Sequence, residues 1–195
     1  MNLDKYQKAA DLLKKIPSIS KKQINKILMH TIDSSKEDIT ALFEALLELK
    51  ENVKKCQICN YLNDKDVCDI CASKIRERKL LIVETSNDVE KFENLDAYNG
   101  YYFVLEGIHT IKGINLKVEA NIEKILNNLD KYKEITLALS STLEGQTTSQ
   151  YIYRKLRDLK FDNVYQLSMG IPYGIAVEYV DPITLKQSLI NKNKF

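Results

Sequence analysis

All four cysteines of this chain fall in one short stretch, as two Cys-x-x-Cys pairs. Cys56 and Cys59 form the first motif, and Cys68 and Cys71 form the second. Each pair turns two thiolates toward one point, and two such pairs complete a tetrahedral shell around a single ion. An all-sulfur shell suits Zn²⁺ and leaves no open position for a substrate. The pattern therefore predicts a structural zinc site with these four ligands.

Two other uses of four cysteines compete with zinc. Disulfides need an oxidising compartment, but the first residues, Met-Asn-Leu-Asp-Lys-Tyr, lack the apolar segment of a secretory signal. An iron–sulfur cluster also takes four thiolates, but two close pairs around a polar loop, residues 60–67, are more typical of zinc. No apolar run approaches the roughly 20 residues that cross a bilayer. We therefore expect a zinc protein of the cytoplasm, without a membrane partner.

The N-terminal segment has the pattern of two short helices. Apolar residues recur at helical spacing over residues 3–15 and again over residues 21–31. Between them, Pro17 ends the first helix and Ser20 is a suitable N-cap for the second. Two helices joined by such a tight turn favour a helix-hairpin-helix.

Lysines gather around the predicted turn. Residues 1–30 hold seven lysines and two acids, and Lys21, Lys22 and Lys26 lie at the start of the second helix. In a helix-hairpin-helix, amide groups at this point face a DNA phosphate and nearby lysines neutralise it. The three lysines are therefore candidate DNA-binding residues. An ordinary αα-hairpin with solvent-exposed lysines fits the same spacing.

A third helix is predicted over residues 36–52, ending at the first cysteine pair. Ser34 or Ser35 precedes it, with two acids in its first turn. We expect its apolar stripe to form a core: Ile39, Leu42, Phe43, Leu46, Leu47 and Leu49.

After the cysteines, apolar runs alternate with helical patterns. This alternation predicts a parallel sheet with right-handed crossovers, in an α/β domain. The predicted strands are residues 79–84, 101–105, 135–139 and 163–167. The predicted helices are residues 87–95, 116–128 and 147–159. A short strand and a last helix, residues 182–190, follow.

Ligands of parallel sheets gather at the carboxyl ends of the strands. Glu84, Asp88 and Glu144 are predicted to lie there, and hard carboxylate oxygens suit Mg²⁺. A solvated acid at a strand end also explains Glu84. For Asp88 we favour an acid that caps a helix, because Asp is common in a first helical turn.

Several motifs in fixed order resemble the RecR family of bacterial recombination mediators, from about residue 13 to residue 189. The matching segments are Ile16-Pro17-x-Ile19, the four-cysteine finger, Leu81-Ile82-Val83-Glu84, Gly100-Tyr101-Tyr102-x-Val104-Leu105-x-Gly107, Thr142-x-Glu144-Gly145-x-Thr147, Gly170-Ile171-Pro172-x-Gly174 and Glu178-Tyr179-Val180-Asp181-x-x-Thr184-Leu185. We therefore expect an α/β multidomain fold. It comprises a helix-hairpin-helix domain (residues 1–53), a zinc finger (54–78), a Toprim-like α/β domain (79–174) and a C-terminal strand and helix segment (175–195).

The resemblance implies a function as well as a fold. Members of this family assemble into rings, often homo-tetramers or dimers, that clamp single-stranded, gapped or double-stranded DNA. They act with RecO, and in some pathways with RecF, to load RecA, which implies a cytoplasmic, nucleoid-associated protein. Lys22 and Lys26 correspond to the family's DNA-contacting positions. Glu84 and Glu144 correspond to Toprim acids that engage partners or DNA.

Three departures from the family pattern identify a diverged member. The usual Pro-Gly-x-Gly hairpin is Pro17-Ser18-Ile19-Ser20, which is expected to reshape or weaken the phosphate contact because glycine permits closer backbone approach. Gln146 replaces an acid. Residues 173–177 read Tyr-Gly-Ile-Ala-Val instead of Val-Gly-Gly-Asp-Leu, which argues against a Walker-B-like segment.

Catalysis is not expected. By resemblance, Toprim enzymes need an Asp-x-Asp pair after a later strand to bind metal, but this chain has Ser140-Ser141-Thr142 there. The chain also lacks a Walker A lysine loop. His109 has no serine or cysteine placed to form a nucleophilic pair. Two alternatives stay open. One is a residual Mg²⁺-dependent nuclease or primase-like enzyme using Glu84, Asp88 and Glu144, and the other is a zinc-stabilised adaptor without DNA contact.

Overall fold

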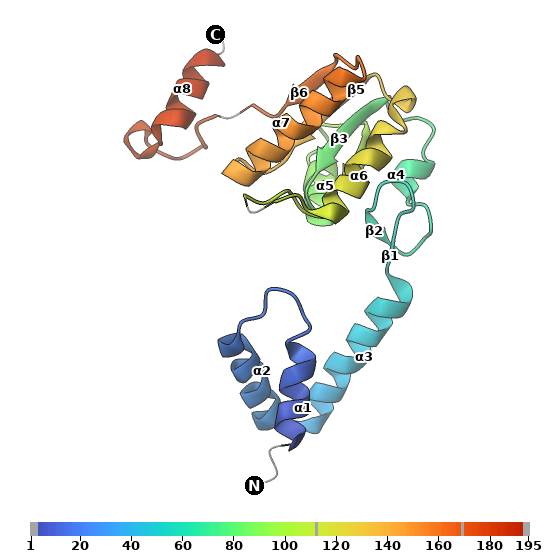
Figure 1. Ribbon diagram of the computed structural model, residues 1–195, viewed down its shortest axis with the longest axis vertical. Coiled ribbons are helices and arrows are strands. Elements are labelled where there is room, and N and C mark those ends of the chain that lie inside the picture. Colours follow the sequence, from blue (N-terminus) through green and yellow to red (C-terminus); the bar gives the residue numbers. More distant parts are fainter. Residues whose placement is uncertain (1–3, 112, 169, 193–195) are drawn as a thin grey trace. The chain divides into compact units, whose positions relative to one another are not determined.

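The computed structural model describes residues 4–111, 113–168 and 170–192 (Figure 1). The chain forms two compact units, Met1–Val53 and Lys54–Phe195. None of the helices in the described ranges is both long and apolar enough to cross a membrane.

The N-terminal unit consists of three helices: α1 (Asp4–Leu13), α2 (Lys21–Asp33) and α3 (Lys36–Asn52). The sequence predicts the first helix from residue 3, which lies outside the described residues. Ala10 of α1 and Ile24 and Leu28 of α2 form a small buried core. The predicted pair of short helices is therefore present, although its use as a helix-hairpin-helix stays a prediction.

The turn between α1 and α2 contains a serine in a backbone conformation that usually requires glycine. Ser18 has φ 64°, in the left-handed region that favours glycine. Ser20 is the N-cap of α2 and forms a capping box with Gln23. The Gln23 amide donates to Ser20 Oγ (3.3 Å), and the Ser20 amide donates to Gln23 Oε1 (2.8 Å).

The apolar stripe of α3 does not form a core, so that prediction is wrong. No residue of α3 is buried, and five of its large apolar side chains are more than half exposed: Leu42, Phe43, Leu46, Leu47 and Leu49. The reason lies in α1 and α2, which bury their apolar faces against each other. All described residues packed around that small core belong to these two helices or to the turn between them.

The sheet of the second unit has the predicted parallel topology. Its strands are β3 (Lys79–Val83), β4 (Tyr101–Val104), β5 (Glu134–Ala138) and β6 (Val164–Gln166), in the order β4-β3-β5-β6. All three pairings are parallel. The apolar run of β3 is continuous because both faces of this central strand are covered.

Helices cover both faces of this sheet, and alternate strand residues face them. The helices are α5 (Ser86–Asn94), α6 (Leu116–Leu126) and α7 (Leu143–Asp158), and a 3₁₀ turn, η1 (Leu129–Lys131), follows α6. Leu81 and Val83 pack with Val89 of α5 on one face. On the opposite face, Leu80 and Ile82 pack with side chains of α6 and α7.

Helix α7 begins four residues earlier than its apolar spacing suggests. Thr142 caps it by accepting a hydrogen bond from the Gly145 amide at 3.1 Å. A Cβ at position 145 would lie 2.0 Å from the Ser140 carbonyl oxygen, so glycine is needed for this close approach. The start of α7 therefore packs directly on the loop that leaves β5.

The C-terminal segment contains no strand among residues 175–192, so that part of the prediction is wrong. Residues Val177–Tyr179 form a 3₁₀ turn, η2, and α8 spans Pro182–Ile190. The amides of Tyr179 and Val180 bond three residues back instead of pairing with the sheet. Asp181 caps α8 by accepting from the amides at positions 183 and 184.

Candidate metal centre and nucleic-acid surface

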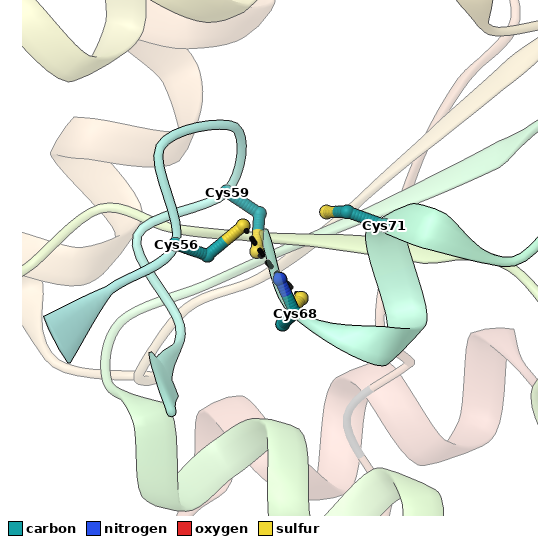
Figure 2. Close-up of side chains that lie close together, drawn as sticks. All are labelled: Cys56, Cys59, Cys68 and Cys71. Carbon is teal, nitrogen blue, oxygen red and sulfur yellow. Dashed lines mark hydrogen bonds between the residues drawn. The ribbon is translucent and has the colours of Figure 1, made fainter. Parts of the chain in front are cut away.

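The cysteines lie on two small elements at the start of the second unit. β1 (Lys54–Lys55) and β2 (Leu62–Asn63) form an antiparallel pair, and the first two cysteines lie in the loop between them. Cys68 is the N-cap of the short helix α4 (Asp69–Ala72), and Cys71 lies within it. A hairpin and a helical turn thus present two sulfurs each to one point (Figure 2).

The geometry of the four sulfurs fits zinc. All four Sγ atoms lie within 4.8 Å of one another, and Cys59 Sγ is 3.7 Å from Cys68 Sγ. A tetrahedral ion with Zn–S bonds of about 2.3 Å places its sulfurs about 3.8 Å apart. The sulfurs are thus arranged for one Zn²⁺, and the predicted structural zinc site is confirmed.

The four thiols lie so close together that their thiolate forms need a bound cation. Without an ion, contact with the Cys68 sulfur and burial raise the pKa of Cys59, and contacts with Cys59 and Cys68 raise the pKa of Cys71. Several thiolates at this spacing repel one another, and a bound dication removes that cost. The Cys68 amide also donates to Cys56 Sγ at 3.4 Å, which supports a charged sulfur.

The finger is fastened to the edge of the sheet. The Val104 amide of β4 donates to the Cys59 carbonyl at 2.8 Å. Asn60, with φ 63°, donates from Nδ2 to the Val104 carbonyl and to Asn121 Oδ1, both at 3.0 Å. Lys55 forms an ion pair with Glu106, which follows β4. The metal centre is therefore part of the α/β unit.

The three predicted acids occupy the expected end of the sheet, with different local roles. Glu84 follows β3 and is half-buried, and Glu144 lies in the first turn of α7. Asp88 Oδ2 accepts from the Thr85 amide (2.9 Å) and from Thr85 Oγ1 (2.8 Å), at the start of α5. Within residues 4–111, 113–168 and 170–192, only the four cysteines converge as metal ligands. The three acids do not form such a cluster.

The predicted DNA-binding lysines lie on the exposed surface of α2. Lys21, Lys22 and Lys26 are all exposed and make no ion pair with a described residue. Lys21 and Lys22 occupy the first two positions after the Ser20 cap. Their amides precede the first bond within the helix, which runs from the Ile24 amide to the Ser20 carbonyl.

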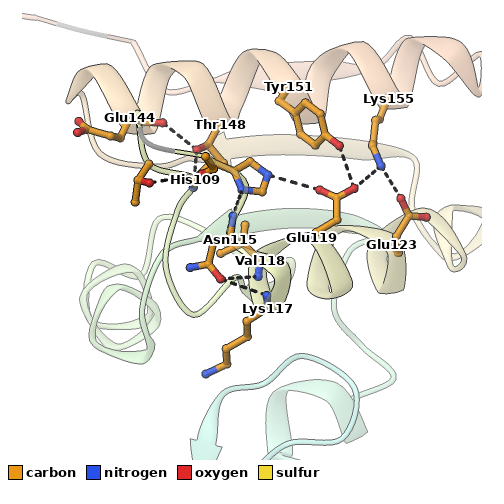
Figure 3. A network of polar contacts seen from close by, with 12 residues as sticks. His109, Asn115, Lys117, Val118, Glu119, Glu123, Glu144, Thr148, Tyr151 and Lys155 are labelled. Carbon is orange, nitrogen blue, oxygen red and sulfur yellow. Dashed lines mark hydrogen bonds and ion pairs between the residues drawn. The ribbon is translucent and has the colours of Figure 1, made fainter. Parts of the chain in front are cut away.

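Sequence reasoning missed a polar network that joins α6 and α7 (Figure 3). His109 is buried, its Nδ1 accepts from the Asn115 amide at 3.1 Å, and its Nε2 lies 3.5 Å from Glu119 Oε2. Glu119 Oε1 accepts from Tyr151 Oη (2.9 Å) and Lys155 Nζ (2.6 Å). Burial alone would raise the pKa of Glu119, but hydrogen bonds from Lys155 and Tyr151 lower it. These residues are far apart in sequence, and no local pattern connects them.

Three family models match the chain in order. They are the four-cysteine zinc finger domain of RecR (residues 53–73), the Toprim domain (78–165) and the C-terminal segment of RecR (170–193).

Curated relatives match over nearly the whole length. Recombination protein RecR of Ureaplasma parvum serovar 3 is 36% identical over 194 residues, covering 97% of this chain and 96% of the relative. The RecR of Mycoplasmopsis pulmonis is 35% identical over 181 residues, covering 92% and 93%. The RecR of Francisella philomiragia is 38% identical over 179 residues, covering 89% and 87%. With its four-cysteine centre and Toprim sheet, this chain belongs to the RecR family of DNA recombination and repair proteins.

Proposed function

We propose that this protein is a non-catalytic mediator that clamps DNA and, with RecO and in some pathways RecF, helps to load RecA on gapped DNA. The observation that carries the proposal is the start of α2. There, Lys21, Lys22 and Lys26 are exposed, without an ion pair to a described residue, beside a capped helix N-terminus. By resemblance, Lys22 and Lys26 correspond to the family's DNA-contacting positions, which supports the proposal.

The start of α2 offers a phosphate both amides and charge. The capping box uses the amides of Ser20 and Gln23, which leaves those of Lys21 and Lys22 for a ligand. The helix dipole adds partial positive charge at the same end, and the lysine side chains add full charges. An anion of the DNA backbone fits this arrangement.

The serines of the hairpin do not argue against this role. Ser18 has φ 64°, in the left-handed region that a glycine would adopt, so this turn has a glycine-like backbone despite the altered sequence. Ser20 adds the cap that holds the first turn of α2 in place. The shape of the loop therefore supports phosphate binding, at a cost in backbone strain at Ser18.

Exposed apolar residues support the proposed ring. The α3 stripe has Phe43 60% and Leu47 62% exposed, and α8 exposes Ile183 and Leu189 to a similar extent. Such residues on neighbouring turns of a helix are usually covered by another protein surface. A homo-dimer or homo-tetramer closed through the two ends of the chain would cover them.

The loop after β5 supports a non-catalytic role. It offers hydroxyls instead of carboxylates, with Ser140 Oγ and Thr142 Oγ1 hydrogen-bonded to each other at 3.1 Å. Asp88 is engaged by Thr85 at a helix cap. Two-metal phosphoryl transfer needs several carboxylates at one point. We assign Glu84 and Glu144 to partner or DNA engagement instead.

The test is DNA binding by fluorescence anisotropy on a gapped duplex over a range of salt concentrations. Lys22→Glu with Lys26→Glu should abolish binding at about 0.15 M salt, because two phosphate contacts become repulsive. Lys91→Glu with Lys133→Glu is the control, since these exposed residues of the second unit change the net charge equally. Equal DNA affinities of the two double variants would argue against DNA binding by the α2 lysines.

Two further measurements separate the alternatives. Solution mass with and without DNA tests the clamp, and a strict monomer in both conditions would contradict it. Incubation with Mg²⁺ and nicked or primed DNA tests the enzyme. Cleavage or synthesis that disappears in Glu84→Gln would establish the metal-dependent alternative. A folded protein without any DNA affinity would establish the adaptor.

A further inference from the structure

Arginine is rare in this chain, and two of its four arginines have structural roles. Arg76 donates to both carboxylate oxygens of Glu93, at 2.9 and 2.5 Å, and to the Gly100 carbonyl at 2.9 Å. Arg78 donates to the Lys131 carbonyl at 2.8 Å and to the carbonyl of Asp130, at the end of η1. The other basic residues, apart from Arg154 and Arg157, are lysines.

The remaining two arginines lie one turn apart on the exposed face of α7. Neither Arg154 nor Arg157 forms a hydrogen bond or ion pair with a described residue. The Arg157 guanidinium lies over the ring of Tyr153, 6.0 Å from its centroid, and Tyr153 is 41% exposed. Cation–π contact holds the guanidinium in place without neutralising it.

The neighbouring Lys155 shows the opposite arrangement. It points toward α6 and pairs with Glu119 at 2.6 Å and Glu123 at 2.5 Å (Figure 3). These hydrogen bonds raise the pKa of Lys155, with that from Glu119 the larger cause. The positive charge of α7 is therefore divided between an inner side, where it is paired, and an outer side, where it is not paired with any described residue.

The outer side of α7 surrounds a shallow hollow of about 520 Å³. Five residues line it: Gln150, Tyr153, Arg154, Arg157 and Asp158. The hollow carries two guanidinium groups that no described residue pairs, against a single acid, so its charge favours an anionic ligand. Guanidinium groups match phosphate oxygens with two parallel hydrogen bonds, and Gln150 adds an amide donor. Asp158 reduces the positive charge of the hollow, so we expect a weaker anion contact here than at the start of α2.

We propose that this surface, the α7 arginine face (Gln150, Tyr153, Arg154 and Arg157), is a second DNA-binding site that holds the phosphodiester backbone of a strand. The site rests on the proposed function, in which α2 makes the first contact. It assigns to the Toprim unit a DNA contact of its own. Arg154 and Arg157 each bind one phosphate of the strand, and Tyr153 positions the Arg157 guanidinium.

The test compares double variants of the full-length, zinc-loaded protein. Arg154→Ala with Arg157→Ala should lower affinity for a single-stranded oligonucleotide about tenfold at about 0.1 M salt. Its plot of log affinity against log salt should be shallower by about 1.4, or about 0.7 for each lost contact. Lys91→Ala with Lys133→Ala removes the same charge elsewhere and should leave the slope unchanged. Arg154→Lys with Arg157→Lys should keep most of the slope but lose part of the affinity.

The outcomes separate this site from the one on α2. Arginine and control variants with equal affinity and slope overturn the α7 arginine face, while loss of binding in Lys22→Glu with Lys26→Glu still supports α2. If only the arginine variant loses DNA binding, the result supports the α7 arginine face and contradicts the proposed DNA contact at the start of α2. A wild-type protein that does not bind DNA overturns both. An equal loss of affinity for a poly-glutamate peptide would show a general anion surface and overturn the assignment to nucleic acid.

Discussion

Asn60 gives the sharpest test of how the zinc finger is joined to the sheet. Its backbone has φ 63°, and its side-chain amide donates to the Val104 carbonyl and to Asn121 Oδ1, both at 3.0 Å. Both interactions are partly buried. Asn60 Oδ1 also accepts a longer hydrogen bond from Lys124 Nζ at 3.4 Å. Replacement by alanine removes all three hydrogen bonds and leaves a residue that disfavours the left-handed region. Replacement by glycine removes the hydrogen bonds alone.

The alanine and glycine variants therefore differ in stability by the cost of backbone strain at position 60. The two hydrogen bonds at 3.0 Å contribute about 1 kcal/mol each and the longer one from Lys124 adds little, so Asn60→Gly should lower the free energy of unfolding by about 2 kcal/mol. Asn60→Ala adds about 1 kcal/mol of backbone strain, giving about 3 kcal/mol. At about 2–4 °C per kcal/mol for a domain of about 150 residues, the alanine variant should melt about 6–12 °C lower.

The assay is urea unfolding of the zinc-loaded protein, with release of Zn²⁺ followed by a chromogenic chelator. Asn63→Ala is the control, because that side chain bonds the Tyr61 carbonyl within the finger itself. Equal stabilities of the alanine and glycine variants would refute the backbone argument. A loss of less than about 0.5 kcal/mol in both would refute the view that Asn60 fastens the finger.

Four other changes test separate parts of the structure. Removal of zinc by a chelator should unfold the finger and destabilise the sheet, seen as a lower Tm that added Zn²⁺ restores; an unchanged Tm would count against it. Gly145→Ala should cost about 2–3 kcal/mol in urea because its Cβ meets the Ser140 carbonyl, whereas Gly170→Ala, with open space, should cost little, and equal effects would be inconsistent with the packing. Ser18→Gly should add about 0.5–1 kcal/mol by relieving the strain at φ 64°, so a loss would disprove that strain. Glu119→Gln should cost about 1–2 kcal/mol at pH 7. Because the pKa of Glu119 is lowered in the folded state, this difference should vanish as the pH falls below 4.5, and a difference that grows in acid would contradict the assignment.

The parts of the fold that sequence predicted well are those with local causes. The four zinc ligands lie close in the chain, and Zn²⁺ chemistry fixes their spacing. The strands of the sheet are short apolar runs between turn residues, so their positions were predicted nearly to the residue. The start of α7 was misplaced because its apolar spacing suggests residue 147, whereas the Thr142 cap and the close packing at Gly145 set the start at Leu143.

The parts that sequence could not predict depend on contacts between distant segments. The apolar spacing of α3 predicts an apolar face but does not identify what covers that face. His109, Glu119 and Lys155 come together because α6 and α7 lie on the same face of the sheet. Nor does the Asn60 side chain reveal its partner, since Val104 is 44 residues away.

The attachment of the finger changes how zinc and DNA binding are connected. The cysteines pack into the same core as the sheet, whereas Lys22 and Lys26 belong to the other compact unit. That unit has a core of its own, built from Ala10, Ile24 and Leu28 without any zinc ligand. Loss of zinc should therefore leave the start of α2 intact and damage the sheet first. Under the proposed function, an effect of zinc on DNA affinity is then expected to act through the second unit, by way of the proposed ring or the proposed α7 arginine face.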